Sequence, residues 1–175
     1  GMWNDGKVNM VSKTDSIYCE ITEIGPVRSQ IKTNYYGWTV GEKKFNLEAK
    51  LSITAGSRLT KTELLIDGIA DNLVTGLAKY KGTNFIKSNS VNGWTYIALY
   101  GNQTLVNEND KLGIALFYKS GDLIELTEDD LSHVVKLKTV NNKTEYYFCA
   151  AWEQEPNGIK TEEEFVMYLN ETLAL

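Results

Sequence analysis

Short runs of alternating hydrophobic and polar residues recur along the chain. The clearest covers residues 46–55, where hydrophobic side chains occupy every second position from Leu47 to Ala55. Side chains alternate across a strand, so this run predicts an antiparallel strand with one buried and one solvated face. Gly, Asn, Asp and Ser clusters separate it from similar runs and predict tight turns. Further strands are expected at residues 17–24, 27–36, 59–67, 73–81, 93–101, 112–119, 123–126, 133–140 and 145–152.

One segment near the C-terminus has helical periodicity instead. A capping-box pattern begins at Thr161, and its acidic first turn suits the positive end of a helix dipole. Phe165, Leu169 and Leu173 then recur at a spacing of four residues and form one apolar stripe. We expect this helix to pack its stripe on a sheet and to close the chain. Residues 127–131 are also compatible with a second, shorter helix.

Many short strands and almost no helix predict an all-β fold, an antiparallel β-sandwich with one C-terminal α-helix. The chain has 175 residues, of which 42% are hydrophobic, so it can bury one substantial core. Residues 1–15 are polar and lack periodicity, and we expect them to form a flexible N-terminal segment. Residues 16–175 are expected to form a single β-sandwich domain.

The overall charge and the cysteines bear on partners and compartment. A net charge of -5 argues against nucleic acid as a partner. The chain has no apolar run of about 18 residues, so we expect no membrane insertion. Cys19 and Cys149 lie far apart in sequence and lack metal-ligand spacing, and they fit either a disulfide or two buried free thiols.

No established catalytic motif is present. The single histidine, His133, excludes a two-histidine metalloprotease motif and a histidine-rich metal site, so we expect neither a metal nor a cofactor. A catalytic triad would have to use His133, which lies in a strand-like run without a recognisable catalytic motif around it. We expect His133 to have a structural role or to lie at the surface. Paired carboxylates remain able to support glycoside chemistry, although single acidic residues on strands usually face solvent.

The aromatic residues give the best remaining functional signal. In the run at 93–101, Trp94, Tyr96 and Tyr100 share one face, whereas Ile97 and Leu99 share the other. The aliphatic face is expected to be core. The aromatic face fits either core packing or a groove that stacks against sugar rings.

Further aromatic and basic residues extend this prediction. Tyr36 and Trp152 belong to two other aromatic groups, and Arg28 is a basic residue that could orient a sugar hydroxyl or carboxylate. We therefore predict a ligand-binding set of Trp94, Tyr96, Tyr100, Arg28, Tyr36 and Trp152, with Lys61 or Lys81 as further rim residues.

Several stretches of the chain resemble a bacterial family known as domain of unknown function 4861. The similar stretches are Glu23 to Arg28, Ile53 to Glu63, Trp94 to Gly101, Tyr146 to Trp152, and the acidic helix that contains Phe165 and Tyr168-Leu169. The resemblance implies a fold related to the galactose-mutarotase-like supersandwich. Its members tend to be exported and to accompany polysaccharide-degrading enzymes. A typical member is longer, and this chain is similar to its C-terminal half.

The resemblance and the aromatic residues together predict a carbohydrate-binding or carbohydrate-processing accessory domain of a bacterial polysaccharide-degradation system. One alternative is a structural or assembly module that uses its aromatic face as a protein interface, either with another protein or in a homo-oligomer. Another is a glycosidase, lyase or sugar epimerase. Gly1 before Met2 has the form of a residue left by tag cleavage, so a signal peptide is presumed to have been removed, and the expected location is periplasmic or extracellular.

Overall fold

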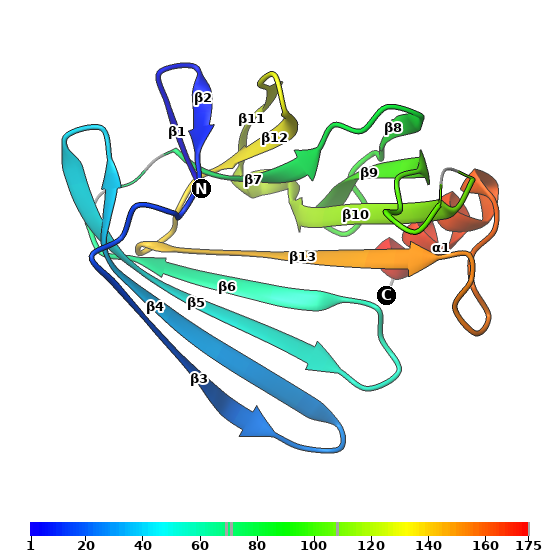
Figure 1. Ribbon diagram of the computed structural model, residues 1–175, viewed down its shortest axis with the longest axis horizontal. Coiled ribbons are helices and arrows are strands. Elements are labelled where there is room, and N and C mark those ends of the chain that lie inside the picture. The colour runs from blue at the N-terminus through cyan, green and yellow to red at the C-terminus, as the bar shows by residue number, and fades with distance from the viewer. Residues whose placement is uncertain (69, 71, 108, 175) are drawn as a thin grey trace.

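The computed structural model describes residues 1–68, 70, 72–107 and 109–174. Within these residues the chain forms two antiparallel sheets, a short 3-10 turn η1 (Ser120–Asp122) and a single α-helix, α1 (Glu162–Ala174). This arrangement confirms the prediction of an all-β sandwich with one C-terminal helix. Figure 1 shows the two sheets stacked at the top of the molecule and α1 at one end of the larger sheet.

The larger sheet has eight strands and the smaller has five. In spatial order, the larger sheet contains β3 (Ser16–Ile24), β4 (Arg28–Val40), β5 (Lys43–Thr54), β6 (Thr60–Ile66), β13 (Lys143–Trp152), β10 (Lys111–Lys119), β9 (Trp94–Asn102) and β8 (Thr83–Lys87). The smaller sheet contains β11 (Leu123–Glu128), β12 (Ser132–Leu137), β7 (Leu73–Ala78), β1 (Met2–Asn4) and β2 (Lys7–Asn9).

The larger sheet has two chemically different faces. The face toward the smaller sheet, here called the sandwich face, carries a row of paired residues that includes Ile31, Leu51 and Tyr146. The opposite face, called the helix-bearing face, carries α1 at one end and charged side chains elsewhere. Strand alternation produces both faces from the same residue runs, as the period-two pattern predicted.

Two hydrophobic clusters join the sheets. Ile97, Leu99 and Leu116 of the larger sheet pack against Val135 and Leu137 of the smaller one, so the aliphatic face of β9 is core as predicted. A second cluster surrounds Trp38, which is fully buried. Burial of each such large side chain contributes about 1.5–3 kcal/mol, so these clusters hold the sheets together.

The N-terminal residues differ from the prediction. Residues 1–15, expected to form a flexible segment, contain the β1–β2 hairpin, and β1 pairs with β7 through Met2 and Leu73. Met2 is 3% exposed because it inserts into the cluster around Trp38. These short strands are ordered by the buried Met2, by a two-residue turn at Asp5 and Gly6, both with positive φ, and by hydrogen bonds to other segments, such as that from the Trp3 N–H to the Asn72 carbonyl.

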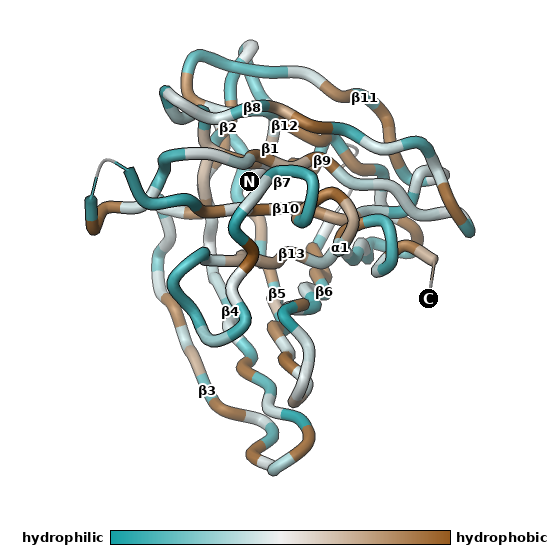
Figure 2. The backbone as a smooth tube through the Cα atoms, turned by 90° about the vertical axis from the view of Figure 1, so that its right-hand side faces the viewer, coloured by the Kyte–Doolittle hydropathy of each residue, from teal (hydrophilic) through white to brown (hydrophobic). Residues whose placement is uncertain are grey.

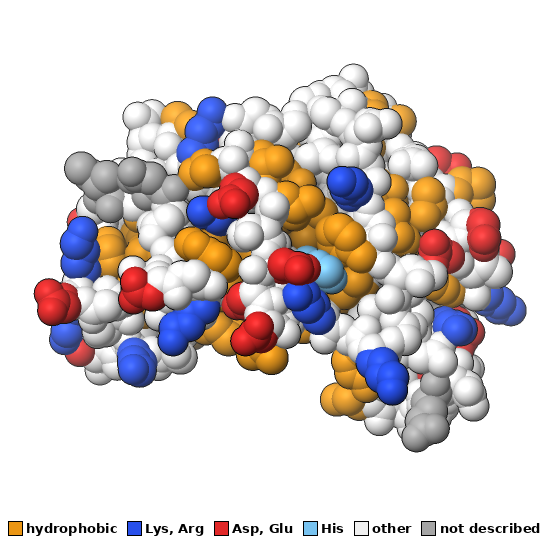
Figure 3. All heavy atoms as spheres, turned by 90° about the horizontal axis from the view of Figure 1, so that it is seen from above, with side chains coloured by type: hydrophobic (Ala, Val, Ile, Leu, Met, Phe, Trp, Pro, Cys, Tyr) orange, Lys and Arg blue, Asp and Glu red, His pale blue; other side chains and the backbone are white. Residues whose placement is uncertain are grey.

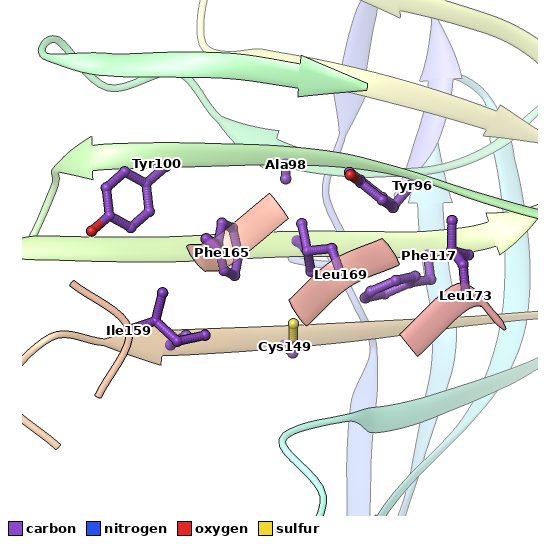
Figure 4. Packing of buried hydrophobic residues seen from close by; sticks show 11 residues of the cluster. Tyr96, Ala98, Tyr100, Phe117, Cys149, Ile159, Phe165, Leu169 and Leu173 are labelled. Carbon is purple, nitrogen blue, oxygen red and sulfur yellow. The ribbon is translucent and has the colours of Figure 1, made fainter. Parts of the chain in front are cut away.

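Helix α1 forms a third layer over β9, β10 and β13. Phe165, Leu169 and Leu173 are buried against these strands, which confirms the predicted stripe (Figure 4). The Glu164 backbone N–H donates to Thr161 Oγ1, as in a capping box, whereas the Glu164 carboxylate accepts from the backbone N–H of Lys160, one residue before Thr161. The helix is therefore positioned by its cap and by its apolar stripe.

The smaller sheet and α1 leave part of the larger sheet uncovered. Strands β3, β4 and β5 fan out away from the rest of the molecule, and the tube in Figure 2 shows them as a projecting wing with hydrophobic segments along it. Here Ile21 is 63% exposed and Ile53 is 54% exposed. The sandwich is thus only partly closed.

Two smaller expectations are settled by the structure. Residues 127–131 do not form a helix, because Thr127 and Glu128 end strand β11 and the carboxylate of Asp129 accepts hydrogen bonds from Leu131 and Ser132 in a turn. Cys19 and Cys149 are both free thiols; Cys19 lies exposed on β3, whereas Cys149 is buried beneath α1.

Candidate functional site

The aromatic face of β9 is not an open groove. Tyr96 is 2% exposed and Tyr100 is 5% exposed, because α1 lies directly over them. The Tyr96 hydroxyl donates to Asn170 on the helix at 3.1 Å, and Tyr100 packs against the Phe165 ring. Burial raises the pKa of both phenols, that of Tyr100 to about 12. The prediction that Tyr96 and Tyr100 line a sugar-binding groove is therefore wrong. Both are core residues, and the apolar stripe of α1 packs against the face that was expected to bind sugar.

Trp94, at the start of the same strand, remains half-buried. Its indole meets the edge of Tyr147 at 5.3 Å between ring centroids. The ammonium of Lys119 lies over the Trp94 ring at 5.6 Å, within the range of a cation–π contact. Trp94 is therefore held by two neighbouring strands at the boundary between the core under α1 and the charged part of the helix-bearing face.

A row of charged residues runs across the helix-bearing face toward Trp94. Cross-strand pairing places the following residues side by side: Glu20, Lys32, Lys50, Glu63 and Glu145. An ion pair between Glu145 and Lys119 continues the row to β10, and Lys119 then contacts Trp94. Counted from Glu20 on β3 to Trp94 on β9, the row crosses six spacings of about 4.8 Å and is roughly 29 Å long.

The centre of the charged row is the carboxylate of Glu145. It lies 2.5 Å from the Lys119 ammonium and 2.9 Å from that of Lys61, which also pairs with Glu63 at 3.2 Å. Two cationic partners on one half-buried carboxylate form a network, which holds side chains in place better than an isolated surface pair.

The network fixes the ionisation state of its members. The hydrogen bond from Lys119 and then that from Lys61 lower the pKa of Glu145, against partial burial. The hydrogen bond to Glu145 raises the pKa of Lys119. For Lys61, partial burial acts to lower the pKa, but hydrogen bonds to Glu145 and Glu63 outweigh it and the pKa is raised. All these groups are charged at neutral pH.

A cleft of about 410 Å³ opens beside the centre of the charged row. Its walls come from β5, β6, β10, β13, the turn η1 and the segment that precedes β13. Four carboxylates and three ammonium groups line it: Glu48, Glu63, Asp122, Glu145, Lys50, Lys119 and Lys143. Leu65 and Val140 supply apolar surface. The cleft therefore offers closely spaced hydrogen-bond donors and acceptors above a partly apolar floor.

The remaining sequence-predicted residues are distributed unevenly. Tyr36 lines a neighbouring hollow of about 300 Å³, which shares Glu48 and Leu65 with the cleft. Arg28 lies on the same face at the far end of β4, where it pairs with Glu23 at 2.7 Å. Trp152 is on the opposite face, and its indole N–H donates to the carboxylate of Asp110. Trp94, Tyr36 and Arg28 thus share one face, and Trp152 does not.

His133 occupies a structural position. Its ring stacks on Phe85 with centroids 4.1 Å apart, and Nδ1 lies 3.6 Å from the carboxylate of Glu128. Burial and then the charge of Lys79 lower its pKa. Figure 3 shows the histidine side chain among charged and hydrophobic neighbours on the upper surface. His133 belongs to β12 of the smaller sheet, whereas the charged row lies on the larger sheet.

Strand pairing explains why sequence reasoning missed part of the site. Glu145, Lys119 and Tyr147 each stand on a predicted strand, but none of them was among the predicted site residues. Their shared face with Trp94 depends on the register between β13, β10 and β9. Lys61, expected as a rim residue, does join this group. The available signal was the parity of charged positions in neighbouring strands, which is usable only once the strand order is known.

Two general features of the described residues complete the description. They contain no group of three or more histidine, cysteine, aspartate or glutamate side chains placed to hold a metal ion. In the same part of the chain, no helix is long and apolar enough to cross a membrane.

Comparison with known proteins gives a family but no assigned activity. The chain is 28% identical over 167 residues to a protein of Formosa agariphila named "Uncharacterized protein P7", which covers 92% of this chain and 40% of that protein. The chain thus spans well under half the length of this curated relative. No solved structure matches this chain. The profile of the family described as "Domain of unknown function (DUF4861)" matches residues 1–174, so the chain belongs to that family, as its sequence stretches indicated.

Proposed function

We propose that this chain is a carbohydrate-binding domain whose ligand lies along the charged row, with one sugar ring stacked on Trp94. The observation that carries the proposal is the junction of Trp94, Tyr147 and Lys119 with the ion-paired Glu145 beside an open cleft. Aromatic rings bind the apolar faces of sugars, and charged side chains bind their hydroxyl groups.

The chemistry of the cleft supports a polyhydroxylated ligand. Carboxylates such as Glu145 and Glu63 accept hydrogen bonds from sugar hydroxyls, and the ammonium groups of Lys119 and Lys143 donate to them. Each sugar hydroxyl can do both, so it fits between neighbouring groups of opposite charge. The roughly 29 Å length of the charged row favours an extended oligosaccharide over a single sugar.

The decisive test compares two tryptophans in similar surroundings. Trp94→Ala is expected to abolish binding in a glycan screen without unfolding the chain. Trp3→Ala is the matched control, because Trp3 is also half-buried and has a lysine, Lys136, over its ring at 5.6 Å, but lies on the smaller sheet. Loss of binding in both variants, or retention in Trp94→Ala, would contradict the assignment.

The same ligand distinguishes binding from turnover. Each glycan that binds is incubated with the chain, and its products are analysed. An unchanged glycan supports the binding role. Cleavage or epimerisation that Glu145→Gln abolishes would instead make the protein an enzyme of the glycosidase, lyase or epimerase class, with a carboxylate in the cleft at its centre.

A further inference from the structure

The uncovered part of the sandwich face is a large apolar surface. On the wing and its border, Ile17, Ile21, Ile31, Ile53 and Phe148 are between 38% and 63% exposed, and all of them point to the side of the smaller sheet. Monomeric proteins seldom leave this much contiguous aliphatic surface in water, and such patches usually mark an interaction site.

Charge separates this surface from the rest of the wing. Apart from Lys43 at the start of β5, which pairs with the buried Val40, the strands β3, β4, β5, β6 and β13 carry no charged side chain at the alternate positions that form the sandwich face. The opposite positions of the same strands carry the charged row. A surface without charge, beside one rich in it, has to be covered by another apolar sheet rather than by a polar ligand.

The edge of the existing core shows where such a sheet would join. A cavity of about 270 Å³ lies between Leu77 of β7 and Leu116, Tyr146 and Phe148 of the larger sheet. The surface continues from this cavity without a break across Leu51 and Ile31 to Ile21. The uncovered face is therefore an extension of the interior between the two sheets.

The size of the surface reaches the lower limit for a specific interface between two chains. The five neighbouring strands β3, β4, β5, β6 and β13 lie about 4.8 Å apart. With a depth of roughly six residues at about 3.4 Å each, their sandwich face has an area of about 500 Å². Two such faces in contact bury about 1,000 Å², where specific interfaces begin. In a symmetric pair, a two-fold axis places the same patch of each copy against the other.

We propose that a second copy of this chain covers the wing, so that two sandwich faces pack against each other in a symmetric homodimer. Such packing needs an apolar sheet surface that no other part of the described chain covers, and the sandwich face of the wing is one. The helix-bearing face and its charged row then point outward on both copies, and the dimer presents two ligand sites on opposite sides.

The mass in solution tests this arrangement. Sedimentation of the purified chain at high micromolar concentration should give twice the 19.7 kDa mass of one chain. Ile31→Lys places a charge at the centre of the contact and should return the mass to that of one chain. The matched control is Leu65→Lys, at a similarly exposed position on the helix-bearing face (39% against 45% for Ile31), which should remain dimeric.

The exposed thiol of Cys19 gives a second measurement that does not depend on mass. Cys19 lies on the sandwich face of β3, so its labelling by a maleimide should be slow in the dimer and fast in Ile31→Lys. Circular dichroism of both variants is the control for folding. A wild-type chain that sediments as one copy and labels rapidly would overturn the proposal, and would leave a further sheet of a longer polypeptide to cover the face. A dimer that survives Ile31→Lys with Cys19 still reactive would also overturn it.

Discussion

Replacement of Phe165 by alanine should loosen helix α1 from the sheet. The Phe165 ring is fully buried, packs on Tyr100 at 5.8 Å between centroids, and lies over Gly113 of β10. Removal of a fully buried phenylalanine costs about 3–5 kcal/mol through lost burial and the cavity left behind. A domain of this size has a free energy of unfolding of about 5–15 kcal/mol, so the variant loses a large part of it.

The loss should also have a local component. A 13-residue helix is marginal on its own in water, so α1 depends on its stripe for its structure. Without Phe165, the helix should detach in part and uncover Tyr96 and Tyr100. Dye binding to newly exposed aromatic surface should therefore increase in Phe165→Ala before the sheets themselves unfold.

Urea denaturation followed by tryptophan fluorescence measures the effect. The matched control is Met167→Ala, on the same helix but 58% exposed, which should change the free energy of unfolding by no more than about 0.5 kcal/mol. Equal losses in the two variants, or a loss below about 1 kcal/mol for Phe165→Ala, would refute the conclusion that this side chain anchors α1.

Two further changes test the packing and the charged row. Gly113→Ala should lower the free energy of unfolding by about 1–3 kcal/mol, because an added Cβ would lie 2.7 Å from the Phe165 ring. The same substitution should cost less in a chain that already carries Phe165→Ala. An equal cost in that chain would contradict the contact. Glu145→Gln should lower it by about 1 kcal/mol at neutral pH. The pKa of Glu145 is lowered below 4.5 in the folded chain, so the difference in free energy of unfolding between wild type and Glu145→Gln should be constant above pH 4.5. This difference should disappear as the pH falls through the folded-state pKa of Glu145. A difference that does not change with pH would contradict the ion pairs.

The fold followed from local patterns to a large extent. The strand at 46–55 was predicted because its side chains alternate, and β5 places Leu47 and Ala49 in the core as the alternation requires. The C-terminal helix was predicted because its stripe and its cap agree. Such signals succeed because the period of a strand or helix acts over a few neighbouring residues and needs no knowledge of distant ones.

The candidate site was predicted less completely. Trp94 was chosen for its aromatic neighbours on β9, yet Tyr96 and Tyr100 are core and its actual neighbours are Lys119 and Tyr147 from other strands. The hairpin at the N-terminus was also missed, because its order comes from Met2 in a distant cluster. Both results depend on contacts between segments that lie far apart in the chain.

The sequence alone therefore determined which segments are strands, which one is a helix, and which side of each element is apolar, since these properties depend on local periodicity. Only the tertiary structure decided what covers each apolar side. It placed α1 over the aromatic face of β9, aligned the charges of six strands into one row, and left the sandwich face of the wing open. These outcomes follow from strand order and register, which are set by packing between distant residues and have no local signature.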